Sequence, residues 1–173
     1  MPGMTSEATP HAGPGVPVAA FDLALPRKRM ASTVLLFDDL DRVLVVEPTY
    51  VDFMELPGGS VDLDESPRQA AIREVKEEFG LDRDPGRLLA IDWVPPRPGR
   101  SEGLIVVFDG GRLTVEEIAG IRLPADELRS YAFLPAAEAA QALPDLLARR
   151  LLSCLEAQEA ATTVYLENGS LTG

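Results

Sequence analysis

The stretch GSVDLDESPRQAAIREVKEEFGL, residues 59–81, combines a complete helix signal with four glutamates, and the rest of the chain is best interpreted from it. Ser66 is a suitable N-cap, Pro67 suits the first helical position, and Gln69 can complete a capping box. Gly80 permits the left-handed backbone conformation that commonly ends a helix. The stretch therefore predicts a helix that begins after Ser66 and ends at Gly80.

The predicted helix has an apolar face and an acidic face side by side. At about 100° per residue, one arc carries apolar side chains and the neighbouring arc carries acids: Ala71, Ile72, Val75 and Phe79 on the first, Glu74, Glu77 and Glu78 on the second. Like charges at this spacing destabilise a helix, and two of the acids lie near the negative end of its dipole. A solvated face balanced by Arg73 and Lys76 is one explanation, but a divalent cation with oxygen ligands explains the pattern more completely.

The spacing of the charged residues across the whole stretch resembles the signature of the Nudix hydrolases. That signature reads Gly, five residues, Glu, seven residues, Arg-Glu-aliphatic, any residue, Glu-Glu, any residue and Gly-aliphatic, and every fixed position is present between Gly59 and Leu81. The resemblance implies an α/β fold, a Nudix-type α/β/α sandwich with a mixed sheet. In that fold the signature loop and helix form the catalytic element.

The resemblance also implies roles for individual residues. The implied metal ligands are the helix glutamates and the backbone of the glycine loop: Glu74, Glu77, Glu78, Gly58 and Gly59. Glu65 corresponds to an acid that supports the metal site, and Arg73 to an arginine that orients the glutamates. The implied cofactor is Mg²⁺, with Mn²⁺ as the alternative.

The general base is left open, because this family takes it either from the helix or from a later loop. Glu74 is the candidate within the helix. Outside the helix, four acids are available, each of which is also explained as an ordinary surface acid: Glu102, Glu116, Glu117 and Glu127. We favour Glu127, which precedes a predicted strand.

The loop at residues 95–100, rich in proline and arginine, offers candidates for substrate recognition. Arg97 and Arg100 lie in this loop, and guanidinium groups suit bidentate phosphate binding. Both arginines are equally explained as solvated loop charges. Trp93 could stack on a base, although an aromatic residue in a strand is more often part of the core.

The chemistry that the resemblance implies is attack of water on phosphorus in a nucleoside diphosphate linked to another moiety. We expect a metal-dependent pyrophosphohydrolase that acts on a small anionic diphosphate. ADP-ribose or a nucleotide sugar is slightly favoured, because Pro96 lies 15 residues beyond Leu81, similar to a proline in relatives that act on ADP-ribose. The alternatives are hydrolysis of an oxidised nucleoside triphosphate or of a non-nucleotide diphosphate, and a catalytically silent domain that binds a nucleotide as a regulator.

The composition narrows the possible partners. The formal net charge is −12 at pH 7, so the overall field of the molecule repels nucleic acid and anionic membranes. Bound cations can still reverse that field inside one pocket. The single cysteine, Cys154, cannot form an internal disulfide. We expect a cytoplasmic protein that binds neither long nucleic acid nor a membrane.

The rest of the chain predicts one domain with tails. Strands are expected at residues 30–37, 43–46, 88–94, 103–108 and 131–134, helices at 135–142 and 145–160, and a small strand at 162–166. Regular structure is expected to stop at residues 57–59. We divide the chain into an arm (1–28), a Nudix hydrolase domain (29–160) and a tail (161–173). The apolar residues 16–25 of the arm are candidates for a homodimer interface.

Overall fold

The computed structural model describes residues 22, 23 and 25–172 of the chain. Its strands are β1 (Arg29–Phe37), β2 (Val43–Pro48), β3 (Gly58–Ser60), β4 (Leu88–Val94), β5 (Gly103–Arg112), β6 (Leu128–Leu134), β7 (Val164–Glu167) and β8 (Ser170–Leu171). Its helices are α2 (Pro67–Phe79), α3 (Val115–Gly120), α4 (Ala136–Ala142) and α5 (Asp145–Glu159).

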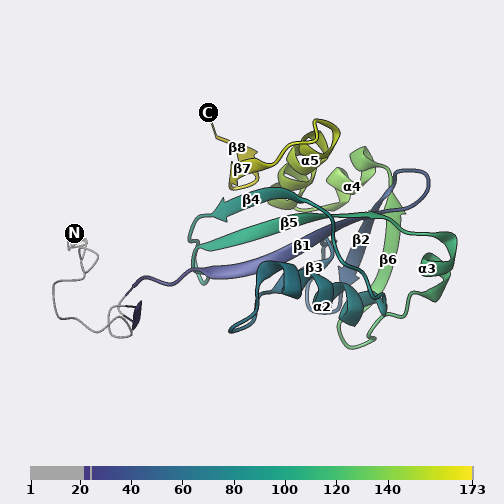
Figure 1. Ribbon diagram of the computed structural model, residues 1–173, viewed down its shortest axis with the longest axis horizontal. Helices are drawn as coiled ribbons and strands as arrows, with labels where there is room; N and C mark the ends of the chain where they lie inside the picture. The colour runs from purple at the N-terminus through teal and green to yellow at the C-terminus, as the bar shows by residue number, and fades with distance from the viewer. Residues whose placement is uncertain (1–21, 24, 173) are drawn as a thin grey trace.

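The strands form one mixed sheet that is organised around β1. The order across the sheet is β6-β2-β1-β5-β4-β7-β8, and β3 pairs with β1 outside this path (Figure 1). β1 runs parallel to β5, and β4 runs parallel to β7, whereas the other pairs are antiparallel. β1 therefore contacts three strands and lies at the centre of the sheet.

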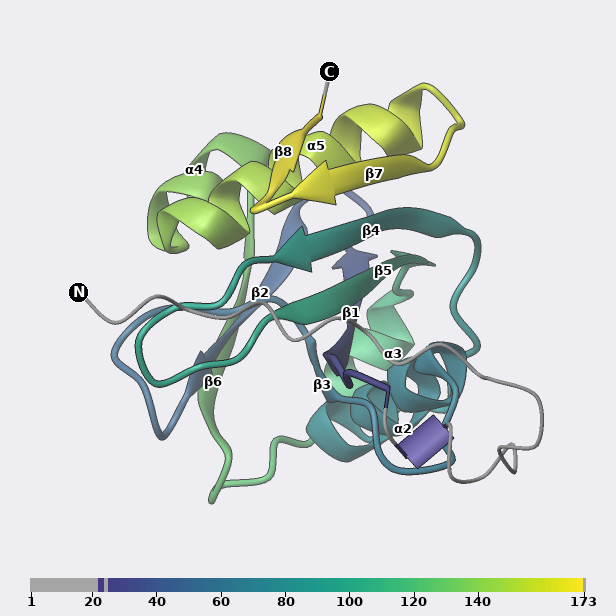
Figure 2. The same cartoon turned by 90° about the vertical axis from the view of Figure 1, so that its left-hand side faces the viewer.

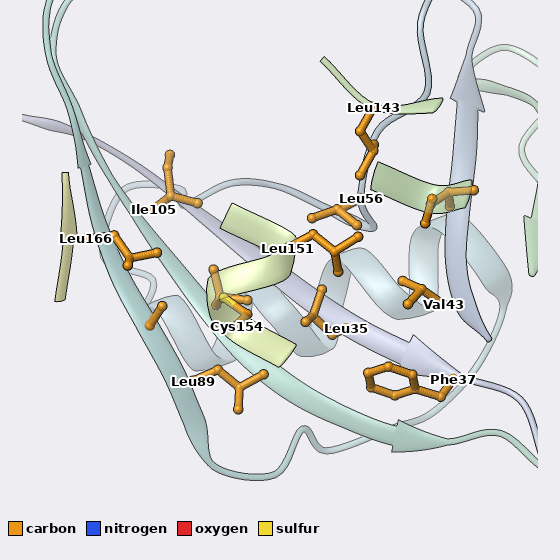
Figure 3. Packing of buried hydrophobic residues seen from close by; sticks show 14 of the residues in the cluster. Leu35, Phe37, Val43, Leu56, Leu89, Ile105, Leu143, Leu151, Cys154 and Leu166 are labelled. Atoms are coloured by element: carbon orange, nitrogen blue, oxygen red, sulfur yellow. The ribbon is translucent and has the colours of Figure 1, made fainter. Parts of the chain in front are cut away.

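Helices cover both faces of this sheet. Along β1, Val34 and Leu36 point into a core that they share with α2, whereas Leu35 and Phe37 point into a core that they share with α4 and α5. Figures 1 and 2 show the two layers of helices on opposite sides of the strands, and Figure 3 shows the core beneath α5, including the buried Cys154. The predicted α/β/α sandwich is confirmed.

The glycine loop departs from the prediction. Residues 57–59 were expected to stop regular structure, but Gly58–Ser60 forms the short strand β3, with Gly58 opposite Thr33 and Ser60 opposite Ala31 of β1. Glycine has a poor intrinsic preference for strands, so this pairing depends on the neighbouring edge of β1 and is not visible in the local sequence.

A second difference lies in the polar stretch after β5. No helix or strand is expected there from the sequence, but α3 forms with a capping box. Thr114 Oγ1 accepts from Glu117 N at 3.2 Å, and Glu117 Oε2 accepts from Thr114 N at 2.7 Å. The Thr-x-x-Glu pattern was a usable signal for this helix.

The ends of the chain leave part of the predicted organisation untested. Most of the expected arm, including residues 16–21, lies outside the described residues, so the division into arm, domain and tail and the dimer interface stay predictions. Within the predicted tail, β7 pairs with β4, so these residues extend the sheet. Among the described helices, none has the length and apolar character needed to cross a membrane.

The turn between β1 and β2 is held by the buried carboxylate of Asp38. Its Oδ1 accepts hydrogen bonds from Leu40 N (3.1 Å) and Arg42 N (2.8 Å), and its Oδ2 accepts one from Arg42 Nε (2.6 Å). Burial on its own raises the pKa of Asp38, but the hydrogen bonds and the charge of Arg42 outweigh burial and hold the pKa below its usual value. The folded state therefore stabilises the ionised carboxylate.

We expect Asp38→Asn to lower the free energy of unfolding at pH 7 by about 1–3 kcal/mol, because the amide loses the charge that binds Arg42. Since the folded pKa lies below the unfolded value of about 4, the contribution is present above that value and is lost as the pH falls through the folded pKa. Urea unfolding at pH 7 and pH 3 measures it. The difference between wild type and variant should narrow at pH 3, and an equal difference at both pH values would contradict the assignment.

Candidate active site

Helix α2 is held at both ends by the contacts that its sequence predicts. Ser66 Oγ accepts a hydrogen bond from Gln69 N at 3.2 Å, and Gln69 Oε1 accepts one from Ser66 N at 2.9 Å. At the other end, Gly80 has a φ of 73°, and its N–H donates to the Lys76 carbonyl at 2.9 Å. These caps fix where each acid of the helix lies, and the predicted helix is confirmed.

The three glutamates of α2 lie at different depths. Glu78 is buried, with 7% of its surface exposed, whereas the side chains of Glu74 and Glu77 are 15% and 55% exposed. Val75 and Phe79 pack into the core beneath them. The acidic face therefore runs from the edge of the core outward to solvent.

Arg73 connects this helix to the loop that precedes it. Its Nε and Nη2 donate to the two carboxylate oxygens of Glu65, both at 2.9 Å. Its Nη1 donates to Glu74 Oε1 at 2.7 Å and to Glu77 Oε2 at 3.0 Å. The hydrogen bonds from Arg73 lower the pKa of Glu65 to about 2. Arg73 thus contacts three of the four glutamates of the signature stretch, and its orienting role stays a prediction.

The backbone of β3 lies directly against the helix glutamates. Gly58 N–H donates to Glu78 Oε2 at 3.0 Å, and a Cβ on Gly59 would lie 2.3 Å from Glu74 Oε1. At Gly58 the φ is 131°, and a Cβ would lie 2.1 Å from the carbonyl oxygen of Ser32. A side chain at Gly58 would force β3 away from the backbone of β1, so the close approach there requires glycine, whereas a side chain at Gly59 would displace the Glu74 carboxylate.

The buried carboxylate of Glu78 has few hydrogen-bond donors near it. Burial raises its pKa well above the usual value, the Gly58 N–H opposes this shift, and the negative charges of Glu74, Glu127 and Glu55 raise the pKa further. Burial likewise raises the pKa of Glu74. A buried acid surrounded by other acids is unfavourable unless it is protonated or a cation joins it.

The donor chemistry here fits a hard divalent cation, because Mg²⁺ and Mn²⁺ prefer carboxylate and carbonyl oxygens. Within residues 22, 23 and 25–172, no three His, Cys, Asp or Glu side chains converge as in a preformed metal site. Arg73 and the Gly58 N–H hold the carboxylates instead, so cation binding requires these side chains to exchange partners. The metal-ligand roles stay predictions for Glu74, Glu77, Glu78, Gly58 and Gly59.

Three of the four later acids lie in surroundings that do not involve the glutamates of α2. Glu102 pairs with Lys28 at 2.6 Å, and Glu117 pairs with Arg83 at 2.6 Å. Glu116 is exposed on α3. These contacts account for the three acids as surface residues.

Glu127 lies in different surroundings. It is exposed just before β6, its carbonyl oxygen accepts a hydrogen bond from Thr49 N at 2.8 Å, and its charge raises the pKa of both Glu74 and Glu78. Of the four candidates, Glu127 is therefore the one whose charge reaches the acidic face of α2.

A cleft of two adjoining cavities begins at the glycines of β3. The smaller cavity, of about 140 Å³, is lined by Gly58, Gly59 and Arg100. The larger cavity, of about 480 Å³, is lined by Arg97 and Arg100 of the loop between β4 and β5. Both arginines that the sequence predicts for phosphate binding therefore lie on the cleft that reaches the glycine loop.

Trp93 lies apart from this cleft. Its indole Nε1 donates to Glu102 Oε2 at 2.8 Å, and it is absent from the residues that line the two cavities. Val94 does line the larger cavity, and successive strand residues point to opposite faces of a sheet. The geometry therefore gives no support to the predicted stacking of Trp93 on a base.

Two further arginines, Arg29 and Arg150, line both cavities and were missed from the sequence. Arg150 lies on α5 with Leu147, Leu151 and Cys154 at helical spacing, so an arginine on an apolar helix face was the available signal. Arg29 opens β1 and carries no such signal.

A family model described as NUDIX domain matches residues 27–154 of this chain. The human diphosphoinositol polyphosphate phosphohydrolase 2 is 41% identical over 66 residues, which cover 38% of this chain and 37% of that protein. The chain spans between 24% and 40% of the length of the curated relatives that it matches.

Solved structures extend the similarity over most of the chain. An ADP-ribose pyrophosphatase from Streptococcus suis 89-1591 is 26% identical, with a TM-score of 0.59 over 82% of this chain and 99% of that chain. The MutT protein of Methanosarcina mazei Go1 is 20% identical, with a TM-score of 0.63 over 78% of this chain and 95% of that chain, which shows a shared fold.

We expect Arg73→Gln to lower the free energy of unfolding by about 1–3 kcal/mol, because it leaves the carboxylates of Glu65 and Glu74 without their shared donor. Lys76→Gln is the matched control on the same helix. Lys76 is 61% exposed and pairs with the exposed Asp82, so its loss should change stability by less than about 1 kcal/mol. Urea unfolding compares the two variants, and equal losses would refute a special role for Arg73.

Proposed function

We propose that this chain, which belongs to the NUDIX family, is a divalent-metal-dependent pyrophosphohydrolase. It would cleave a phosphoric anhydride linkage in a small organic diphosphate. One observation carries the proposal. Glu74 and Glu78 lie against the glycines of β3, where an arginine-lined cleft begins. The acids supply oxygen ligands for a cation, and the cleft supplies positive charge for phosphate groups.

The proposed metal site uses the acidic face of α2. Glu74, Glu77 and Glu78 would hold Mg²⁺, or Mn²⁺ in its place, together with the backbone of Gly58 or Gly59. When bound, the cation neutralises phosphate charge and lowers the pKa of a coordinated water.

Arg73 and Glu65 act as positioning residues in this proposal. Arg73 holds Glu74 and Glu77 on one side of the helix, and Glu65 occupies two of the guanidinium nitrogens and so fixes the plane of Arg73. Such supporting contacts keep the glutamates beside the proposed site until they exchange these partners for the cation.

In the proposed reaction, water attacks one phosphorus of the linkage, the bond to the bridging oxygen breaks, and two phosphate-containing products leave. The proton of the water passes to a carboxylate oxygen. We propose Glu127 as this base, because its charge reaches Glu74 and Glu78 and none of the ion pairs among the described residues includes it. Glu74 is the alternative base, although Arg73 holds its Oε1.

Two classes of substrate are candidates. ADP-ribose or a nucleotide sugar is favoured by the similar Streptococcus suis enzyme, named as an ADP-ribose pyrophosphatase, and by Pro96 after the signature stretch. A highly phosphorylated non-nucleotide diphosphate is favoured by the human relative, named for diphosphoinositol polyphosphates. An oxidised nucleoside triphosphate is a further alternative.

A catalytically silent, nucleotide-binding regulator is the alternative function. The complete set of signature acids and the contacts of Arg73 with three of them favour the enzyme. The cytoplasmic location and the homodimer stay predictions from the sequence.

We expect the protein with Mg²⁺ to release a monophosphate product from at least one member of a panel of ADP-ribose, a UDP-sugar, a diphosphoinositol polyphosphate and an oxidised nucleoside triphosphate. Chelation of the metal should abolish turnover. The double variant Glu77→Gln plus Glu78→Gln should be at least about 100-fold slower, because it removes two of the proposed metal ligands. Glu127→Gln should lower kcat and leave Mg²⁺ affinity unchanged.

The control variant is Glu138→Gln, which removes an exposed glutamate of α4 and should keep the wild-type rate. No turnover on any member of the panel, or a wild-type rate from the double variant, would rule out the proposed enzyme. Normal kcat in Glu127→Gln would transfer the role of base to Glu74.

A further inference from the structure

Four arginines surround the cleft and give it a charge opposite to that of the molecule as a whole. The larger cavity is lined by Arg29, Arg97, Arg100 and Arg150, which we call the arginine pocket, and by one carboxylate, that of Glu55. The chain as a whole carries a formal net charge of −12. Guanidinium groups placed close together repel one another, and an anion bound among them would relieve that repulsion.

Arg29 lacks a partner for part of its side chain. Its Nε is buried and has no hydrogen-bond acceptor among the described residues. The guanidinium lies over Gly103, where a Cβ would come within 2.7 Å of Nη2. Burial and the nearby positive charges of the other three arginines lower the pKa of Arg29, so the four groups are close enough to repel one another. An anionic ligand would relieve both the missing hydrogen bond and the repulsion.

Arg150 is held in place from behind. Its Nε donates to Asp92 Oδ2 at 2.8 Å, and Asp92 Oδ1 accepts from Gly169 N at 3.0 Å, all within the interior beneath α5. Arg150 is only 4% exposed, yet it lines both cavities. The hydrogen bond from Nε to Asp92 restricts the orientation of the guanidinium at the wall of the cleft, and a guanidinium held in one plane favours bidentate binding of an oxyanion.

Ser32 connects the arginine pocket to the glycine loop. It is fully buried, and its Oγ has no hydrogen-bond partner among the described residues. It lines the smaller cavity together with Gly58, Gly59 and Arg150. An unpaired hydroxyl between the two ends of the cleft is a second group that a polar ligand would satisfy.

We propose that the arginine pocket binds phosphate groups of the substrate that lie outside the scissile linkage, so the preferred substrates are diphosphates that carry additional phosphate monoesters. This inference rests on the proposed function, because it assumes that the scissile diphosphate lies at the glycine loop beside Glu74 and Glu78. The scissile group is then served by the metal site. Arg29, Arg100 and Arg150 line both cavities, and Arg97 lines the larger one. The guanidinium groups therefore extend from the glycine loop into the larger cavity and exceed what the scissile diphosphate beside the metal site requires.

A nucleobase is the competing occupant. Tyr50 and Phe53 also line the larger cavity and are exposed, so a base could stack between them and an arginine. The face of a stacked base would contact at most one guanidinium group. Several phosphate groups, by contrast, could accept hydrogen bonds from all four arginines. The two occupants differ in how strongly binding depends on each arginine.

The test uses inositol hexakisphosphate, which carries phosphate monoesters but no anhydride to cleave, titrated calorimetrically into the full-length protein with and without Mg²⁺. We expect Arg29→Gln and Arg97→Gln each to weaken binding by about tenfold or more, since each removes a charged donor. Arg97 is exposed in its loop, so its variant keeps the test valid if Arg29→Gln unfolds. Arg112→Gln is the control, because Arg112 is exposed and lines neither cavity.

The second part of the test measures turnover with Mg²⁺. It compares two substrates that carry additional phosphate groups, an inositol derivative and a nucleotide. We expect kcat/KM to be at least about tenfold higher for a diphosphoinositol polyphosphate, or for the 2′-phosphate of ADP-ribose, than for ADP-ribose itself. That preference should disappear in Arg97→Gln.

The inference is overturned if AMP binds as tightly as inositol hexakisphosphate, or if neither arginine variant weakens binding. It is also overturned if the diphosphate that carries additional phosphate monoesters is turned over equally well by wild type and both variants, a result that leaves the proposed function intact. Arginine-dependent binding of inositol hexakisphosphate without turnover of any diphosphate would instead support the pocket and count against the hydrolase.

Discussion

The buried carboxylate of Glu78 is the constraint around which the rest of the site is arranged. It lies where α2 meets β3, with the Gly58 N–H as its hydrogen-bond donor and with other acids nearby. Such a group is costly in a folded protein unless its charge is compensated. Binding of a divalent cation would compensate it, and the same cation would supply the chemistry of the proposed phosphoric anhydride hydrolysis. The buried Glu78 carboxylate, which on its own destabilises the folded state, is therefore also the group that the proposed function needs.

The sheet brings this constraint and the cleft together. One edge of β1 pairs with β3 at Thr33 and with β2 at Phe37, so the glycine loop lies at the centre of the molecule. The opposite edge pairs with β5, whose first residue, Gly103, leaves space for Arg29. The glycines of β3, which contact the acids of α2, and arginines from β1, α5 and the β4–β5 loop therefore line one continuous cleft although they are far apart in sequence.

Helix α2 was predictable because its capping residues lie close together in the sequence. Contacts between residues that are far apart in the sequence were not predictable. Ser66, Gln69 and Gly80 act within a few residues of one another, so the helix and the spacing of its acids followed directly. β3 could not be predicted, because its glycines pair only through the edge of β1. Arg29 and Arg150 were missed for the same reason, since the fold alone brings them together, and the geometry leaves Trp93 away from the cleft. Arg97 and Arg100 were found because proline and arginine mark an exposed loop.

Crystals grown with Mn²⁺ and measured for anomalous scattering test the central claim most directly. The account predicts an anomalous peak within about 2.0–2.6 Å of carboxylate oxygens of Glu74 and Glu78, beside the backbone of Gly59, with Arg73 turned away from Glu74. It also predicts that this peak is lost in Glu78→Gln. A Mn²⁺ peak elsewhere on the acidic surface, or an unchanged peak in Glu78→Gln, would contradict the assignment of the acidic face of α2 as the metal site.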